Sequence, residues 1–97
     1  MNPEDIKDQF LEVLTEIQTD SGYGGTSISG ETRPMTDLEG FDSLLCVEAI
    51  NMLADKLNVE IPSSQVHKIV LSEDGKQHLT IDESVGIIFK IVNTGET

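Results

Sequence analysis

Asp42 and Ser43 are the residues whose types and position most clearly suggest chemistry in this 97-residue chain. They follow a glycine and an aromatic residue, and an apolar run begins directly after them at Leu44. Asp-Ser is a common helix start, so the simplest interpretation is that one of the two side chains caps a helix. A serine in this place could also carry a phosphodiester, because the positive end of the helix dipole tolerates phosphate. Asp42 is itself an anion and slightly opposes such a group.

Apolar residues close to Ser43 favour the second interpretation. Leu44, Leu45 and Val47 fall at the start of the expected helix, largely outside its main apolar stripe, so we expect part of their surface to be exposed. Exposed apolar residues beside a helix-terminal hydroxyl, on an acidic protein, indicate a docking surface around an attachment point.

Other residues give little support to catalysis. His67 and His78 stand alone, without partners at metal-ligand spacing, and are expected to be ordinary surface histidines. The run Gly22-Tyr23-Gly24-Gly25 follows a helix and lacks the lysine of a phosphate-binding loop. The many carboxylates have neither the spacing of a calcium loop nor that of a general acid-base pair. We therefore expect no catalytic residues, no enzyme activity and no metal site.

Three main helices are expected to position these residues. The first covers roughly residues 3 to 19, with Asn2 as its cap and apolar residues at helical spacing. The second covers residues 43 to about 57, where Asn58 can adopt the left-handed conformation that closes a helix. The last opens at Thr80-Ile81-Asp82-Glu83, which has the pattern of a capping box.

The connecting segments complete a prediction of an all-α bundle in one domain, residues 1–97. A long loop of about residues 20–38 joins the first two helices, and a loop of this length tends to be functional or mobile. One short helix is expected at residues 63 to 69. Residues 71–79 contain a turn, with a small hairpin around Asp74-Gly75 as the competing interpretation. The side chains expected to point inward from these segments are Ile28, Met35, Leu38, Ile61, Val66 and Ile69.

Acidic residues dominate the composition, and the formal net charge is −12. Eleven of them occur up to Glu48, against only Lys7 and Arg33. Such a surface repels nucleic acid and anionic lipid and attracts basic protein partners, although the charge alone is also typical of a small soluble protein. No apolar run could span a bilayer, the N-terminus is acidic, and the single cysteine, Cys46, cannot form an internal disulfide. We therefore expect a cytoplasmic protein without stable membrane insertion.

A wider pattern surrounds Ser43. Asp42-Ser43-Leu44 is followed by Val47-Glu48, by an aliphatic helix with Leu53 and Leu57, and by Val59-Glu60-Ile61-Pro62. In this respect the chain resembles the acyl carrier proteins, and the resemblance extends over most of the chain except the glycine loop and residues 71–79. It implies the four-helix bundle of that family, a monomer, and a carrier without catalytic activity.

The resemblance also implies a cofactor and partners. A phosphopantetheinyl transferase would attach 4′-phosphopantetheine from coenzyme A to Ser43, flanked by Asp42 and Leu44, and acyl groups would travel as thioesters on the prosthetic thiol rather than on Cys46. Acyl-loading and acyl-transfer enzymes with basic or apolar patches would dock on the same helix. The residues expected to contact them are Leu44, Leu45, Val47, Glu48, Asn51 and Asp55. The candidate walls of an acyl pocket, which would be core in any case, are Phe10, Leu14, Met35, Ile50, Leu53, Ile61, Val85 and Ile88.

Some positions depart from the family pattern. The spacer Glu39-Gly40-Phe41 is one residue longer than usual, and Leu45, Ala54 and Lys56 stand where acidic residues are frequent. These departures predict a specialised carrier, in fatty acid, lipid (including lipid A and lipopolysaccharide) or polyketide biosynthesis. An aminoacyl or peptidyl carrier, and an unmodified helical interaction module in which Asp42-Ser43 is only a cap, stay open as alternatives.

Overall fold

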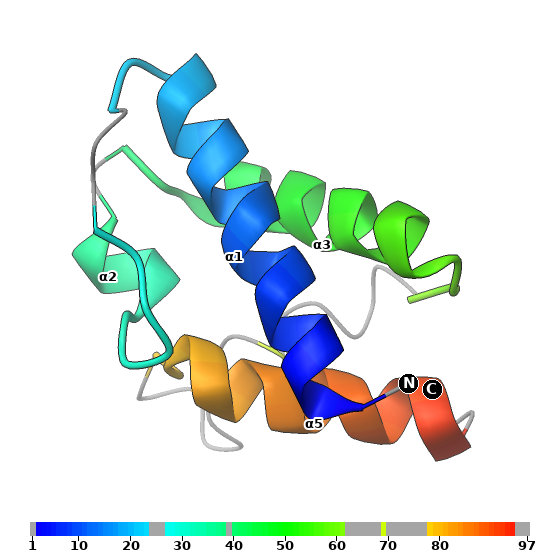
Figure 1. The fold of residues 1–97 in the computed structure, drawn as a ribbon. Helices are drawn as coiled ribbons and strands as arrows, with labels where there is room; N and C mark the ends of the chain where they lie inside the picture. Colours follow the sequence, from blue (N-terminus) through cyan, green and yellow to red (C-terminus); the bar gives the residue numbers. More distant parts are fainter. Residues whose placement is uncertain (1, 24–26, 39, 62–68, 70–77, 95–97) are drawn as a thin grey trace.

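In a computed structural model of the protein, four helices make up most of the described chain (Figure 1). They are α1 (Pro3–Asp20), α2 (Pro34–Asp37), α3 (Ser43–Leu57) and α5 (Ile81–Thr94), and no β-strand occurs among the described residues. This confirms the predicted all-α bundle. The structure describes residues 2–23, 27–38, 40–61, 69 and 78–94, without the side chains of Ser43 and Thr94.

Helix α1 begins and ends through local hydrogen bonds. The Asn2 side chain accepts from the Asp5 N–H at 2.9 Å, so it caps the helix as predicted. At the other end Gly22 has φ +91°, and its N–H donates to the Thr19 carbonyl at 3.1 Å. The Tyr23 N–H donates to the Gln18 carbonyl at 2.7 Å. This pair of bonds is the Schellman motif, which needs one residue in the left-handed conformation. Glycine adopts this conformation without strain.

The ends of α3 and α5 agree with the sequence. Asn58 closes α3 in the left-handed conformation, with φ 55° and ψ 45°. At the start of α5 the Thr80 N–H donates to Glu83 Oε1 at 2.9 Å, while the Glu83 N–H donates to Thr80 Oγ1 at 3.2 Å. These two reciprocal bonds confirm the predicted capping box.

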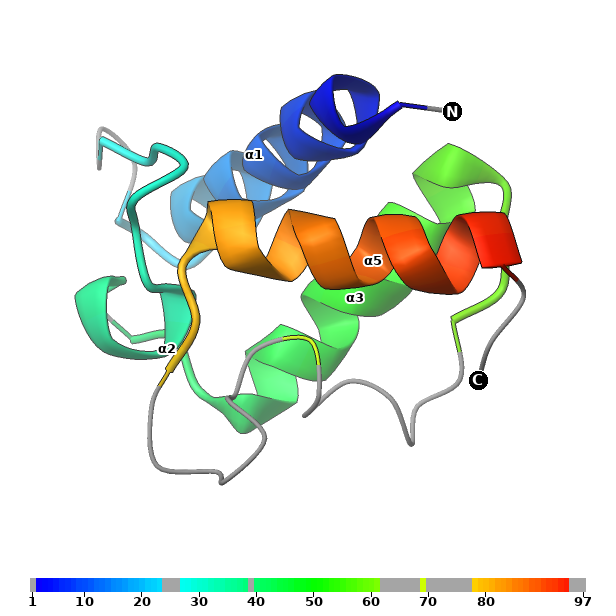
Figure 2. The ribbon, with the colours of Figure 1, turned by 90° about the horizontal axis from the view of Figure 1, so that it is seen from below.

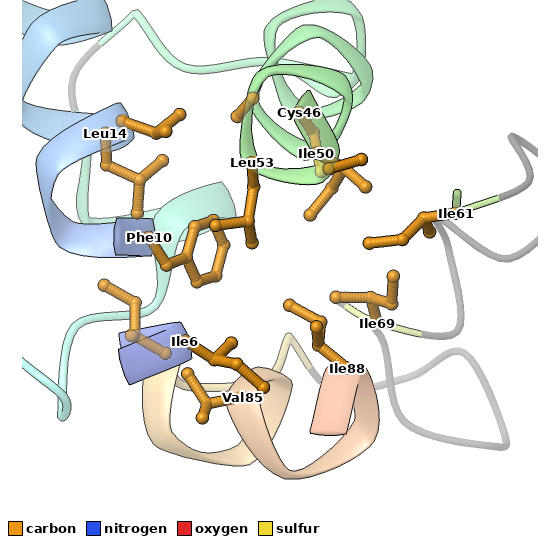
Figure 3. Packing of buried hydrophobic residues seen from close by; sticks show 14 of the residues in the cluster. Ile6, Phe10, Leu14, Cys46, Ile50, Leu53, Ile61, Ile69, Val85 and Ile88 are labelled. Atoms are coloured by element: carbon orange, nitrogen blue, oxygen red, sulfur yellow. The ribbon is translucent and has the colours of Figure 1, made fainter. Parts of the chain in front are cut away.

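Burial of apolar side chains from three helices forms the core. Helix α1 packs against both α3 and α5, and Figure 2 shows α5 crossing in front of α3. Phe10 of α1, Leu53 of α3 and Val85 of α5 point toward one another in this core (Figure 3). Since burial of one such side chain contributes about 1.5–3 kcal/mol, this shared cluster holds the bundle together.

The segment between α1 and α3 has more structure than the predicted loop of residues 20–38. It includes the short helix α2, and its Leu38 is buried while Ile28 and Met35 are partly buried against the core. Two of its carbonyls accept from the start of α5: Thr32 O from the Ile81 N–H and Gly30 O from the Asp82 N–H, each at 2.9 Å. The loop prediction missed the short helix α2, and the long-range bonds to α5 are not visible in a local sequence pattern.

Further polar contacts join distant parts of the chain. The hydroxyl of the fully buried Ser84 donates to the Ile69 carbonyl at 2.6 Å. Arg33 Nε donates to the His78 carbonyl at 3.1 Å. The His78 side chain is half-buried, whereas a surface position was predicted. Lys7 Nζ lies 3.0 Å from Asp82 Oδ1 and joins α1 to α5, but such a solvent-exposed ion pair contributes only about 0–1 kcal/mol.

Several predictions fall outside the described residues. They concern the glycines of residues 24–25, most of the short helix at residues 63 to 69, His67, Val66, and most of residues 71–79. Of the short helix only Ile69 is described, and this residue is helical and fully buried.

We predict that Gly86→Ala stabilises the protein by about 1 kcal/mol, because alanine is the better helix former and an added Cβ meets no described atom within 4 Å outside the local helix backbone. Urea unfolding measures the change. Gly30→Ala is the contrasting variant, because a Cβ at Gly30 would collide with the Asp82 carboxylate and displace it from Lys7. The interpretation is contradicted if both variants shift the unfolding midpoint in the same direction.

We predict that Thr80→Ala lowers the free energy of unfolding by about 1 kcal/mol at neutral pH, through loss of one half of the capping box.

The backbone hydrogen bond from Thr80, then its hydroxyl and the Arg33 charge, lower the pKa of Glu83. A lowered folded-state pKa means that the carboxylate stabilises the fold above its unfolded pKa, and that this contribution is lost as the pH falls through the folded value.

Glu83→Gln therefore makes the loss of stability between neutral and acidic pH shallower than in the wild type, as measured by urea unfolding across that range. Glu16→Gln, on the exposed side of α1, changes the net charge equally and serves as the control. Identical pH profiles for Glu83→Gln and Glu16→Gln would show that the capping box has no role in the pH dependence.

Candidate functional site

The turn that precedes Ser43 is held from the inside by two apolar side chains. Leu38 and Phe41 are 4% and 7% exposed, and the Phe41 N–H donates to the Leu38 carbonyl at 3.3 Å. Gly40 is the third residue of this turn and has φ +71°. A type II turn needs a positive φ at this position, and glycine adopts it most easily.

Ser43 is the first residue of α3. Asp42 precedes it as the cap: its Oδ1 accepts from the Leu45 N–H at 2.9 Å, and its carbonyl accepts from the Cys46 N–H at 2.9 Å. The Asp42 carboxylate is therefore bonded to the helix that it caps. The side chain of Ser43 lies outside the described part of the structure, but its backbone starts the helix at the residue that the sequence predicts.

One face of α3 carries the exposed members of the predicted partner surface. Leu44 is 78% exposed, and Glu48, Asn51 and Asp55 are exposed at intervals of three and four residues, which places them on one stripe. Isolated exposed leucines are common on protein surfaces. Leu44 is informative because it directly follows Ser43 and shares its stripe with two carboxylates.

The other apolar candidates lie on the flanks of this stripe. Leu45 and Val47 are partly buried against the core, on opposite sides of α3. Each of them leaves some apolar surface beside Ser43, although less than Leu44 does. The predicted partner surface thus consists of an exposed stripe with two partly buried edges.

Two of the positions that depart from the acidic pattern do not face outward with this stripe. Ala54 is only 7% exposed and belongs to the core. Lys56 Nζ lies 3.3 Å from Glu12 Oε1 and so contacts α1. A carboxylate at position 54 would have to be buried, and burial of an unpaired charge is costly. These two residues are explained by packing and pairing within the chain.

The residues proposed as walls of an acyl pocket all belong to the core. Most of them are buried, and Met35 packs partly buried against the others; the buried ones are Phe10, Leu14, Ile50, Leu53, Ile61, Val85 and Ile88. Figure 3 shows how those it labels converge from α1, α3, α5 and the segment after α3. Their packing explains the stability of the bundle.

Cys46 is 3% exposed and packs in the same core, one turn after Ser43. Desolvation by burial raises the pKa of its thiol to about 11. A thiol in this environment stays protonated near neutral pH and is a poor nucleophile. The buried position makes Cys46 a packing residue of the core.

Within the described residues, no three side chains of His, Cys, Asp or Glu come together in the way that a metal ion requires. None of the helices in that part of the chain has the length and apolar character of a membrane span.

Tyr23 makes a contact with Gly40, near the site, that was not predicted from the sequence. Its ring lies against Gly40, so that a Cβ at Gly40 would be 2.6 Å from Tyr23 Cε2. A glycine in the spacer and an aromatic residue in the preceding loop were the available signals, but a pairing across 17 positions needs the tertiary structure.

Comparison with known proteins gives one informative likeness. A 66-residue stretch, 66% of the chain, is 42% identical to part of a polyketide synthase, GfsA, of Streptomyces halstedii. The chain spans only about 1% of the length of that relative. No known protein family matches the chain, and no solved structure matches it.

We predict that Cys46 in the folded protein reacts slowly with a thiol-specific disulfide reagent at pH 8, and rapidly after denaturation, because burial keeps the thiol protonated and inaccessible. Absorbance of the released reagent anion measures the rate. Asn51→Cys adds an exposed thiol on the same helix as a control, and one equivalent should then react at once. Rapid reaction of the wild-type thiol would mean that the core opens easily at this point.

Proposed function

We propose that this protein is a carrier that holds 4′-phosphopantetheine on Ser43 and transports thioester-linked acyl intermediates of polyketide assembly. The observation that carries the proposal is the position of Ser43 as the first residue of α3, directly before the 78% exposed Leu44. The likeness to a stretch of a polyketide synthase supports the choice of pathway.

The architecture of the described residues supports a carrier rather than a synthetic enzyme. A stretch of 66 residues corresponds to a small fraction of a synthase and is enough for a single compact helical unit. The described residues form such a unit around one core. We therefore propose that the chain has no catalytic activity of its own and that its partners supply the chemistry.

The residues present around Ser43 are compatible with the proposed prosthetic group. A phosphodiester at the start of α3 would meet the positive end of a 15-residue helix. The Asp42 carboxylate opposes it, but this charge is already bonded to the Leu45 N–H. When attached, the group supplies a thiol on a long flexible arm. No side chain of the described core could supply a thiol on such an arm.

The attachment itself needs only an accessible hydroxyl on this chain. The Ser43 oxygen would form a bond to the phosphorus nearest the pantetheine of coenzyme A, while the bond to the adenosine bisphosphate leaving group breaks. The serine proton would pass to a base of the transferase. The acidic residues Asp42, Glu48 and Asp55 would attract a basic transferase surface to this end and face of α3.

We predict that incubation with coenzyme A and a broad-specificity phosphopantetheinyl transferase increases the intact mass by one phosphopantetheine group, and that Ser43→Ala abolishes this gain. Ser21→Ala removes an exposed hydroxyl at the end of α1 and should load like the wild type. Mass spectrometry of the intact chains measures all three.

An unmodified wild type would contradict the proposal and favour a helical interaction module in which Asp42 is only a cap. If the chain loads, mass analysis of the protein from its native cells identifies the cargo. A polyketide intermediate supports the proposed pathway, whereas a fatty acyl, lipid-precursor or aminoacyl group would assign the carrier to another pathway.

A further inference from the structure

Tyr23 links the end of α1 to the turn before Ser43. Its backbone N–H completes the Schellman motif through the bond to the Gln18 carbonyl at 2.7 Å, so its main chain is held by α1. Its ring reaches the Leu38–Phe41 turn, where an ideal Cβ on Gly40 would lie 2.6 Å from Cε2, 3.1 Å from Cζ and 3.2 Å from the hydroxyl oxygen. The ring thus lies against the side of Gly40 on which a Cβ would stand, while Gly40 itself stays exposed.

The hydrogen bond described within this turn is a weak restraint. Its internal hydrogen bond from the Phe41 N–H to the Leu38 carbonyl is long, at 3.3 Å, and Gly40 is the most permissive residue that a turn can contain. Leu38 and Phe41 hold the turn from the core side. Tyr23, which is 36% exposed, contacts the turn at Gly40.

We infer that Tyr23 is a positioning residue for the modification of Ser43: its ring restricts the Gly40 turn and thereby fixes the approach of the chain into α3. This inference rests on the proposed function. Gly40 lies three residues before Ser43 and two before the Asp42 cap, so a change of the turn alters the start of the helix that the transferase must recognise. A misplaced reacting group lowers the rate of a bound complex even where its binding surface is intact.

The contact can be tested on the unmodified protein by a double-mutant cycle. Gly40→Ala should lower the urea midpoint of the wild type, because the methyl group meets the Tyr23 ring and because φ +71° strains alanine. In a Tyr23→Ala background only the backbone strain persists, so the same substitution should lower the midpoint by less. Equal decreases in the two backgrounds would overturn the inferred contact.

The positioning role is tested by the kinetics of loading, with the carrier as the varied substrate of the transferase. We expect Tyr23→Ala to lower kcat about tenfold while KM stays within about twofold, because the acidic stripe of α3 still binds the enzyme. Tyr23→Phe, which keeps the ring over Gly40, should restore the wild-type rate. Thr19→Ala, an exposed change in the last turn of α1, should load like the wild type.

The possible outcomes separate this inference from the proposed function. A wild type that takes up no phosphopantetheine overturns the proposed function and the inference together. A wild type and a Tyr23→Ala variant that load with equal kcat overturn the inference alone. A raised KM with unchanged kcat also overturns it, because Tyr23 would then be a contact for the enzyme rather than a positioning residue.

Discussion

Burial of one apolar stripe of α3 determines how this helix is rotated about its own axis. Ile50 and Leu53 are fully buried, and Cys46 and Ala49 accompany them on the same side. Residues on the opposite side of a helix with 3.6 residues per turn must then face solvent, which is where Leu44 and its exposed neighbours lie. The site depends on this rotation. Without the buried stripe, no packing interaction would determine which face of α3 points toward solvent.

Helix α1 makes this arrangement possible because both other long helices, α3 and α5, pack against it. Phe10 lies in the common centre of the bundle, and the cluster around it includes side chains of α3 and α5 (Figure 3). Long-range hydrogen bonds then restrict the segments between the helices. The carbonyls of Gly30 and Thr32 bind the first N–H groups of α5, and the Tyr23 ring lies against the turn before α3. Connecting segments therefore tie the ends of the helices together, while the core sets their packing.

Charge is distributed unevenly over this framework. The exposed stripe of α3 carries Glu48 and Asp55, whereas Lys56 pairs with Glu12 and Lys7 with Asp82. These two cations neutralise carboxylates between helices and leave the outer face of α3 acidic. A basic partner would meet negative charge around an exposed leucine at the start of the helix, a combination that gives both attraction over distance and an apolar contact.

Local signals were sufficient to predict the three long helices and several of their ends, although not the short helix α2. The Asn2 cap, the capping box that Thr80 opens and the left-handed Asn58 depend on hydrogen bonds and backbone conformations within a few residues, and periodicity identified the buried stripes. Local sequence also gave the start of α3 at Ser43. The tertiary structure alone decided which residues meet across the chain: Tyr23 on Gly40, and the loop carbonyls on α5. Such contacts depend on how the core orients whole helices, and no short-range pattern records that orientation.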